Sequence, residues 1–406
     1  MSWVQTAYLQ EIHKDGSAGQ VLQADIRKSD FSPWAGQVQC VYLDPPFMTG
    51  EEFFLHMRVG EKGWETGRSG VTLPAYSDRF ASKAEYLSLL RCALENAKML
   101  LNETGSLFLH LDSRMSAHAR ILCDEIFGEN NFVNEIIWAY QSGGRSMKRF
   151  SRKHDVILFY RKSRKQFFDI TSVPLPRSEN RQNHMRRCVD EDGRTYRTIQ
   201  SGGKTYTYYD DEPVYPGDVW ADVSHLQQKD PQRTGYDTQK PQALLSRIIL
   251  SATRPGDLVA DFFGGSGTTA IAAASHGRRY LISDMSPLAL SVTRKRLLDT
   301  ALTLHAPSLC PDVKMTADFV PGIAFHDVQL TSYETPEGCE ITGLDAVDQW
   351  SVGFYQEGVF HAHASAARRK HTPALPQLLQ LPQLRGTPAI LIVDVYGNRS
   401  LWIQED

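Results

Sequence analysis

The sequence predicts an α/β fold with a doubly wound, mostly parallel sheet of the Rossmann-like kind. Two segments predict it. The apolar run 41–43 leads into Asp44-Pro45-Pro46-Phe47, which is typical of a buried strand that ends in a rigid loop. Residues 257–284 contain an apolar strand, a glycine-rich turn, an alanine-rich helix and a second strand. Because ligands bind at the carboxyl ends of strands in open α/β sheets, we expect the two loops to adjoin in space.

The loop after the first strand combines hydrogen-bond acceptors with an aromatic ring. The Asp44 carboxylate and the Pro45 carbonyl can each accept a hydrogen from an exocyclic amino group, and Phe47 can stack on the base. Proline fixes φ and removes N–H donors, so Pro45 and Pro46 would hold the acceptors in place. The motif predicts a site for a base pulled out of its stack. Taken alone, it also fits a rigid turn without a ligand.

A basic insert, residues 141–235, separates the two motifs. Residues 141–207 contain 16 Lys and Arg against 6 Asp and Glu, a net charge of +10; the whole chain carries −3, so the remainder carries −13. Interleaved aromatic residues and glycines indicate a duplex-binding region, in which the loop 142–148 would order on DNA. A solvated loop face is the alternative. The DNA-binding candidates are Arg145, Lys148, Arg149, Arg152 and Lys153.

The segment 236–305 contains the second motif. Its glycines would let the turn approach a ligand closely, and the following helix would offer free N–H groups to an anion. Asp284 stands 20 residues after Gly264, where such folds place the carboxylate that binds ribose hydroxyls. Gly277 is expected to end the helix, and Ser286-Pro287 to begin the next one.

This turn leaves one rival open. Residues 265–270 also fit the fingerprint G-x-G-x-x-A of nicotinamide and flavin enzymes. A P-loop is disfavoured, because no Lys-Ser/Thr pair follows the last glycine. An acceptor pair for an amino group has no role in hydride transfer, but it fits a methyl acceptor. The first motif therefore favours S-adenosylmethionine over a nicotinamide.

The tail, residues 306–406, has several β-like runs and predicts a small β-rich C-terminal domain. Gly397-Asn398 between two of these runs predicts a hairpin turn. Such a domain would suit dimerisation, DNA binding or contact with a partner. The sequence does not decide among these roles.

Composition and the pattern of cysteines limit the class of protein to which the chain can belong. The 406 residues, 41% of them hydrophobic, can bury a large core, and no apolar stretch long enough to span a membrane is present. The N-terminus lacks a signal-peptide pattern and the six cysteines lack C-x-x-C spacing, so a cytoplasmic protein without structural zinc is expected. His361 and His363 form a close pair without further ligands nearby, so no metal site is predicted.

Together these motifs resemble the β-class amino-methyltransferases, the DNA N6-adenine and N4-cytosine methyltransferases, and in particular those similar to type III modification subunits. In this family the Asp-Pro-Pro-aromatic motif precedes the glycine loop, a circularly permuted order. The resemblance spans roughly residues 18–300. Its further matches lie at residues 23–25, 107–112, 127–138, 154–160 and 238–241.

The resemblance implies a role for each matching residue. Asp25 would contact the adenine ring of S-adenosylmethionine, Asp284 its ribose, and residues 262–268 its methionine end. Thr238, Gln239 and Lys240 would close the pocket from the side. The glycine-loop motif consists of Asp261, Phe262, Gly264, Gly265, Ser266, Gly267 and Thr268. One departure is Met48, where close relatives often have Asn.

The implied reaction is direct in-line methyl transfer to N6 of a flipped adenine in double-stranded DNA. The domains would be a catalytic half (1–140), the basic insert (141–235), the cofactor-binding half (236–305) and the accessory domain (306–406). N4-cytosine methylation is the nearest alternative, and a catalytically idle S-adenosylmethionine sensor that binds DNA is another. RNA as substrate, a homodimer and a separate restriction subunit are compatible with the sequence, and no membrane partner is expected.

Overall fold

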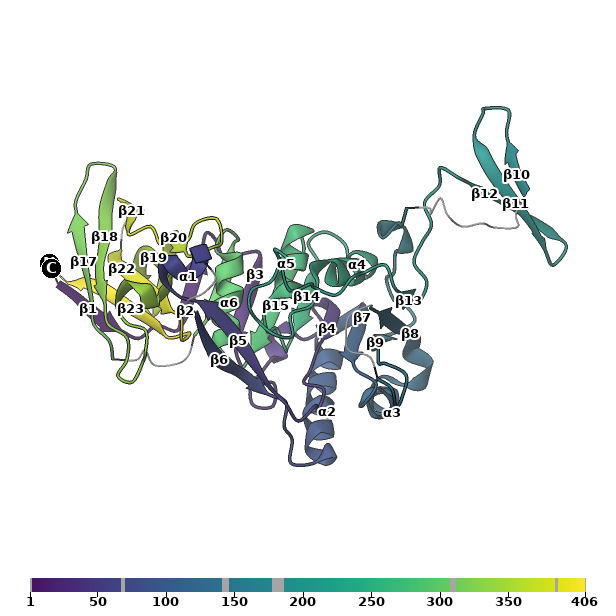
Figure 1. Ribbon diagram of the computed structural model, residues 1–406, viewed down its shortest axis with the longest axis horizontal. Helices are drawn as coiled ribbons and strands as arrows, with labels where there is room; N and C mark the ends of the chain where they lie inside the picture. The colour runs from purple at the N-terminus through teal and green to yellow at the C-terminus, as the bar shows by residue number, and fades with distance from the viewer. Residues whose placement is uncertain are drawn as a thin grey trace.

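A large sheet forms the centre of the protein. The computed structural model describes residues 2–66, 70–140, 146–176, 186–306, 312–383 and 386–405, and among these the largest sheet has 15 strands. Six neighbouring strands at its centre are parallel, which confirms the predicted α/β fold (Figure 1). In sheet order they are β16 (Leu302–His305), β3 (Gly19–Gln23), β15 (Arg279–Asp284), β14 (Leu258–Asp261), β4 (Val38–Leu43) and β7 (Leu101–Leu111).

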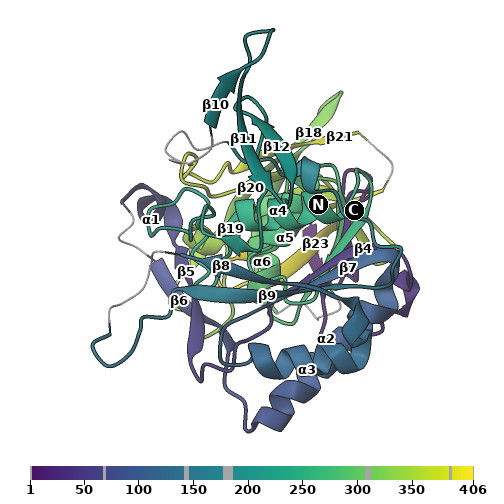
Figure 2. The same cartoon turned by 90° about the vertical axis from the view of Figure 1, so that its right-hand side faces the viewer.

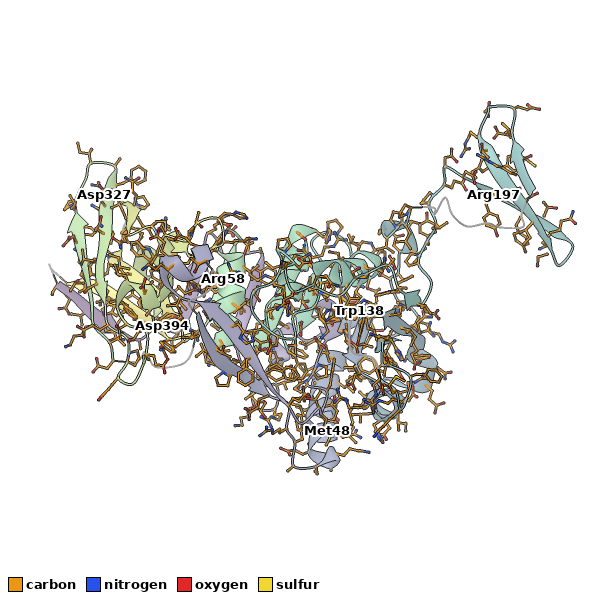
Figure 3. The ribbon with its side chains drawn as sticks, viewed as in Figure 1. Met48, Arg58, Trp138, Arg197, Asp327 and Asp394 are labelled. Atoms are coloured by element: carbon orange, nitrogen blue, oxygen red, sulfur yellow. The ribbon has the colours of Figure 1, made fainter. Side chains whose placement is uncertain are left out.

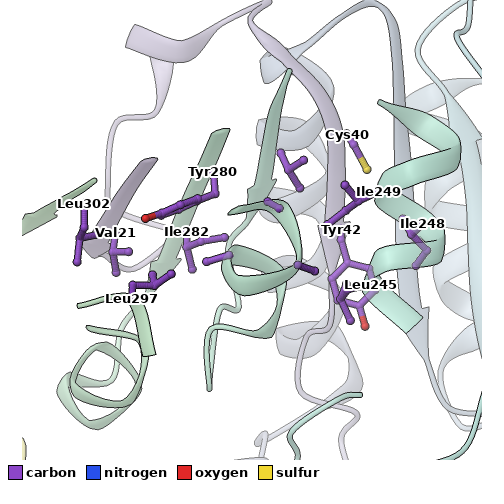
Figure 4. Packing of buried hydrophobic residues seen from close by; sticks show 14 of the residues in the cluster. Val21, Cys40, Tyr42, Leu245, Ile248, Ile249, Tyr280, Ile282, Leu297 and Leu302 are labelled. Atoms are coloured by element: carbon purple, nitrogen blue, oxygen red, sulfur yellow. The ribbon is translucent and has the colours of Figure 1, made fainter. Parts of the chain in front are cut away.

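Helices cover both faces of these strands because side chains alternate along each strand. In β4, Val41 and Leu43 pack in the cluster that contains α2 and α3, whereas Cys40 and Tyr42 pack against α4 on the other face (Figure 4). Ser82 accepts a hydrogen bond from the Glu85 amide and caps α2. The described helices are α1 (Gly60–Thr66), α2 (Lys83–Leu100), α3 (Ser116–Phe127), α4 (Gln242–Ala252), α5 (Thr268–Ser275) and α6 (Pro287–Leu297).

The strand order reverses between β14 and β4. The chain runs from β14 through α5 to β15 on one side, and from β4 through α2 to β7 on the other. The carboxyl ends of β14 and β4 therefore flank a switch point, where open α/β sheets bind ligands. Both predicted motifs follow these two strands directly.

Beyond β7 the sheet continues with antiparallel β9 (His154–Arg161) and β8 (Phe132–Ala139), and then β13 (Val219–Trp220). A separate three-stranded sheet projects from the body in Figures 1 and 2. It consists of β10 (Arg186–Val189), β11 (Thr195–Ser201) and β12 (Lys204–Tyr209). The basic insert thus contributes β9 to the central sheet and also carries this projecting sheet.

A hairpin of β5 (Glu52–Arg58) and β6 (Gly70–Ser77) follows the first motif. Its side chains Leu55 and Met57 share a buried cluster with Tyr236 and with Val292 of α6. This packing holds the hairpin close to the glycine loop, because Tyr236 of the same cluster lies next to Gly265.

Several strands of the C-terminal segment extend the central sheet. β20 pairs in parallel with β2, which pairs with β16, and the chain ends meet where β1 pairs with β23. The hairpin turn at Gly397-Asn398 is confirmed, since β22 and β23 are antiparallel neighbours. At this end of the sheet the N-terminal part of the chain contributes β1 (Ser2–Thr6) and β2 (Gln10–His13). The C-terminal segment contributes β19 (Val347–Gln356), β20 (Val359–Ala367), β22 (Thr387–Asp394) and β23 (Arg399–Glu405).

A second layer completes this end of the molecule. The small sheet of β17 (Met315–Val320), β18 (Phe325–Tyr333) and β21 (Leu378–Pro382) shares a core with Trp350 and Trp402 of the large sheet. The segment 306–406 is therefore β-rich, as expected. Its division from the catalytic region at residue 306 stays a proposal, because β1 and β2 of the first segment pair with its strands.

A buried ion pair joins α6 to β2, and hydrogen bonds from the same arginine join α6 to β19. Arg294, fully buried, donates to Glu11 of β2 at 2.6 Å, to Ser351 of β19 at 2.7 Å and to Gln349 at 2.8 Å. Removing one partner of such a pair leaves an uncompensated buried charge. The C-terminal strands and the glycine-loop region are thus held in one arrangement.

Candidate active site

A cavity of about 760 Å³ lies at the carboxyl ends of β4 and β14. The two motifs, 220 positions apart between Asp44 and Gly264, both line it. Gly267 is outside the lining and caps α5 behind the loop. Of the predicted residues, those lining the cavity are Asp25, Asp44, Pro45, Pro46, Phe47, Thr238, Gln239, Lys240, Asp261, Phe262, Gly264, Gly265, Ser266, Thr268 and Asp284.

Asp44 has two differently placed carboxylate oxygens. Oδ2 accepts a hydrogen bond from Nζ of Lys240 at 2.5 Å, and both side chains are largely buried. Oδ1 is buried and has no hydrogen-bond partner among the described residues. An unsatisfied buried acceptor costs about 1–3 kcal/mol, so its presence in a cavity indicates a ligand that donates a hydrogen bond.

Lys240 lines the cavity together with Thr238 and Gln239 and also contacts the acceptor motif. Its ammonium contacts Asp44 and lies 5.2 Å from the centre of the Phe47 ring. The Thr238 hydroxyl accepts a hydrogen bond from Tyr76, and Gln239 is bonded to Thr234 and Gln232. The segment closes one side of the cavity, and within it Lys240 reaches the acceptor motif.

Asp78 is a site residue that sequence reasoning missed. Its buried carboxylate accepts hydrogen bonds from the amides of Phe47 at 3.2 Å, Met48 at 2.8 Å and Thr49 at 2.9 Å, and from the Thr49 hydroxyl at 2.7 Å. Four bonds to one carboxylate fix the loop that carries the Phe47 ring. No local pattern marks Asp78, because only the β5–β6 hairpin brings it back to this loop.

Met48 adopts a left-handed backbone conformation, with φ of 56°. Among residues other than glycine, this region suits Asn and Asp and is strained for most other side chains. This explains why Asn is suited to the position where this chain has methionine. Met48 also packs partly against the core that contains α2 (labelled in Figure 3).

The glycine loop is shaped by close approach and by positive φ. A Cβ at Gly264 would lie 2.2 Å from the Ile282 side chain, so only glycine fits there. Gly265 has φ of 49°, and Gly267 has φ of 75° where α5 begins. From α6, Arg296 donates to the Ser266 carbonyl at 2.6 Å and supports the turn.

Two carboxylates hold the ends of this loop. Asp284 accepts from the amides of Gly265 and Ser286, each at 2.8 Å, and Asp261 accepts from the Phe263 amide and the Thr269 hydroxyl. Each oxygen keeps further lone pairs, so Asp284 can still accept from a ligand. Ser286-Pro287 begins α6, as expected.

Burial determines the ionisation of these carboxyls. It raises the pKa of Asp261 to about 7, with a further contribution from the negative charge of Asp44 nearby. Burial also raises the pKa of Asp284. Asp25 differs: hydrogen bonds from Arg27, at 2.8 and 2.9 Å, lower its pKa. Burial thus favours the neutral forms of Asp261 and Asp284, and a positively charged ligand in the cavity would favour their ionised forms.

A polar cluster supports the strand ends next to Asp44. His110, fully buried, bonds to the Tyr42 hydroxyl at 2.8 Å and to Asp155 at 3.2 Å, and Asp155 also accepts from the Tyr140 hydroxyl. The His110 ring lies 5.9 Å from the Phe47 ring, centre to centre. Both ring nitrogens of His110 thus have hydrogen-bond partners.

The family model of the N6 and N4 DNA methylases matches residues 38–295, more than half of the chain. The chain belongs to this family.

The chain is also similar to individual DNA methylases. The chain is 24% identical over 306 residues to the type II methyltransferase M.EcaI of Enterobacter cloacae, covering 64% of each chain. It is 24% identical over 265 residues to the DNA adenine methyltransferase YhdJ of Escherichia coli (strain K12), covering 65% of this chain and 77% of YhdJ. Among solved structures, the cytosine-N4-specific PvuII DNA methyltransferase is 15% identical with a TM-score of 0.45, covering 73% and 91% of the two chains. The 64% coverage of M.EcaI means that the chain spans less than two thirds of the length of that relative.

The candidate DNA-binding residues of this methylase-family chain lie outside the cavity. Lys148, Arg149 and Arg152 are exposed in the segment between β8 and β9, and Lys153 is half-buried there. Arg145 lies outside the described residues. Tyr206 and Tyr208 are exposed on the projecting sheet, which also carries Arg197, far from Trp138 in Figure 3.

The projecting sheet is less basic than the insert as a whole. Arg194 is paired with Asp211, and Arg187 and Arg197 are both paired with Asp210. The positive charge of this sheet is therefore largely offset by neighbouring carboxylates, whereas Lys148, Arg149 and Arg152 form no ion pair with a carboxylate of the described ranges.

In the described ranges, no three His, Cys, Asp or Glu side chains are grouped as metal ligands. No helix there is both long and apolar enough to cross a membrane.

Proposed function

We propose that the protein is a site-specific DNA methyltransferase that transfers a methyl group from S-adenosylmethionine to N6 of a flipped adenine in double-stranded DNA. The unpaired Oδ1 of Asp44 carries this proposal, because it lies in the same cavity as the glycine loop. Membership of the DNA methylase family supports it.

The side chains around Asp44 match the needs of an amino group. Oδ1 of Asp44 and the Pro45 carbonyl would accept the two amino hydrogens, which favours a pyramidal nitrogen with its lone pair exposed. Phe47 would stack on the base, and Asp78 holds the loop that positions this ring. The Asp44 carboxylate would also stabilise the positive charge that develops on the nitrogen.

The rest of the cavity suits S-adenosylmethionine. Its volume of about 760 Å³ is within the usual range for small-molecule sites. Asp25, Asp284 and the loop 262–268 would hold the cofactor, and the surrounding carboxylates suit its positive charge. When bound, the cofactor supplies a methyl group activated by a sulfonium, so the protein needs only to align and stabilise.

Adenine is the preferred base. Asp at the first motif position leans towards adenine by family similarity, and YhdJ is an adenine methyltransferase. N4-cytosine is the second candidate, since the same acceptor pair fits its amino group. An idle sensor is disfavoured, because binding alone does not require the acceptor geometry of Asp44. The proposal places the enzyme in the cytoplasm with DNA as partner, and any nuclease on a separate subunit.

The test incubates the purified protein with labelled S-adenosylmethionine and unmethylated genomic DNA, and mass spectrometry then identifies methylated nucleosides. We expect N6-methyladenine from the wild type and none from Asp44→Ala or the closer mimic Asp44→Asn. N4-methylcytosine would change the base but keep the site. Absence of any methylated nucleoside, with the cofactor bound and the protein folded, would overturn the proposal.

A further inference from the structure

Two large apolar side chains of the segment 146–153 are fully exposed. Met147 and Phe150 have relative exposures of 100% and 99%. Lys148, Arg149 and Arg152 alternate with them, and the structure shows no ion pair between these cations and any carboxylate of the described ranges. An apolar tip surrounded by unpaired positive charge is complementary to a nucleic-acid duplex, whose phosphates surround a stack of bases.

Hydrogen bonds connect the C-terminal end of this segment to the active site. The Tyr140 amide donates to the Lys153 carbonyl at 2.9 Å, which closes the loop, and the Tyr140 hydroxyl donates to Asp155. Asp155 bonds to His110, whose ring lies 5.9 Å from the Phe47 ring. The end of the segment at Lys153 is therefore connected, through Tyr140, Asp155 and His110, to the residue proposed to stack on the flipped base.

Strand register places the segment at the correct edge of the sheet. Leu43 of β4 pairs with Leu109 of β7, and Leu111 pairs with Val156 near the start of β9. The start of β9 thus lies at the carboxyl ends of β4 and β7, where Asp44 is found. In Figure 2 the segment extends outward beyond β8 and β9.

We infer that Phe150 is a wedge that enters the DNA base stack and fills the space left when the target base turns into the cavity. The inference rests on the proposed function. Flipping a base costs unpairing and unstacking, and a ring inserted in its place recovers stacking with the neighbouring bases. Lys148 and Arg149 would bind phosphates on either side of the ring.

Phe150 fits this role better than Met147, because a planar ring can stack on two bases at once whereas a thioether chain cannot. Phe150 would be a positioning residue, since it does not touch the reacting atoms. Its loss should therefore affect only substrates whose base must be extruded.

The methylation site is first mapped on plasmid DNA. The test then uses a synthetic duplex that contains this site, and a second duplex in which the target base is mismatched. Phe150→Ala should methylate the matched duplex about 10-fold more slowly than the wild type. The mismatched duplex, whose base is already unpaired, should restore most of the rate. Phe150→Trp should keep wild-type behaviour, and Met147→Ala is the matched control that should also do so.

The outcomes separate this inference from the proposed function. Equal rates for Phe150→Ala and wild type on matched DNA would overturn the wedge, as would an equal loss on both duplexes or a defect confined to Met147→Ala. Affinity for S-adenosylmethionine, measured by calorimetry, should be unchanged in Phe150→Ala, and a loss there would point to misfolding instead of a wedge. A wild-type protein that methylates neither duplex would overturn both proposals.

Discussion

Lys240 and Asp44 form an ion pair of 2.5 Å inside the cavity, although 196 positions separate them in the sequence. The pair occupies one oxygen of the carboxylate and leaves the other as a free acceptor. The ion pair therefore fixes the orientation of Asp44 and leaves the lone pairs of Oδ1 available to a ligand in the cavity. An aspartate without this partner could rotate and lose that arrangement.

Replacing Lys240 by Gln should slow methyl transfer. A charge-assisted hydrogen bond contributes about 1.5–3 kcal/mol, so the single-turnover rate should fall about 10- to 100-fold. Lys240→Arg keeps the charge and should retain most of the rate. A faster Lys240→Gln enzyme would mean that the pair blocks Asp44, which contradicts a positioning role.

Replacing Asp78 by Ala should unfold the loop that carries Phe47. Three partly buried amides and a hydroxyl would lose their acceptor, which should cost about 3 kcal/mol in the free energy of unfolding. Urea denaturation would measure this loss, and the rate of methylation should fall with it. Asp78→Asn keeps one acceptor oxygen and should be intermediate. A fully active, fully stable Asp78→Ala would show that the loop is held by other contacts.

Met48 offers a test of backbone strain. With φ of 56°, methionine and alanine are strained here, whereas glycine is not. Met48→Gly should therefore be more stable than Met48→Ala by about 1 kcal/mol, since both lose the same packing. Comparing these two variants by urea denaturation removes the effect of the lost side chain. Equal stability, or a more stable alanine variant, would contradict the strain.

Asp261 should make stability depend on pH. Its pKa of about 7 lies above the ordinary aspartate value of 3.8, so between these values the native state holds a proton that the unfolded chain has lost. The contribution of Asp261 to the free energy of unfolding should accordingly fall as pH rises from about 4 to about 7 and then level off.

Asp261→Asn lacks this titration and isolates the effect. Its free energy of unfolding minus that of the wild type should increase by about 2–4 kcal/mol between about pH 4.5 and pH 8. Urea titrations at constant ionic strength would measure the difference. A difference independent of pH would mean that Asp261 is ionised in the native state throughout this range.

The sequence by itself determined the local elements and the two motifs. The strand before Asp44, the glycine turn at 264–267 and the start of α6 at Ser286-Pro287 follow from apolar runs, positive φ and capping, which neighbouring residues decide. Because both motifs end parallel strands, their meeting at one cavity was also predictable.

Only the tertiary structure decided the partners of Asp44 and of the Phe47 loop. Lys240 reaches Asp44 from the loop before α4, and Asp78 arrives through the β5–β6 hairpin. The pairing of β2 with β20, which joins the C-terminal strands to the central sheet, is equally remote in sequence. Such contacts depend on which surfaces pack together in the whole fold, and short-range patterns of residues do not specify that choice.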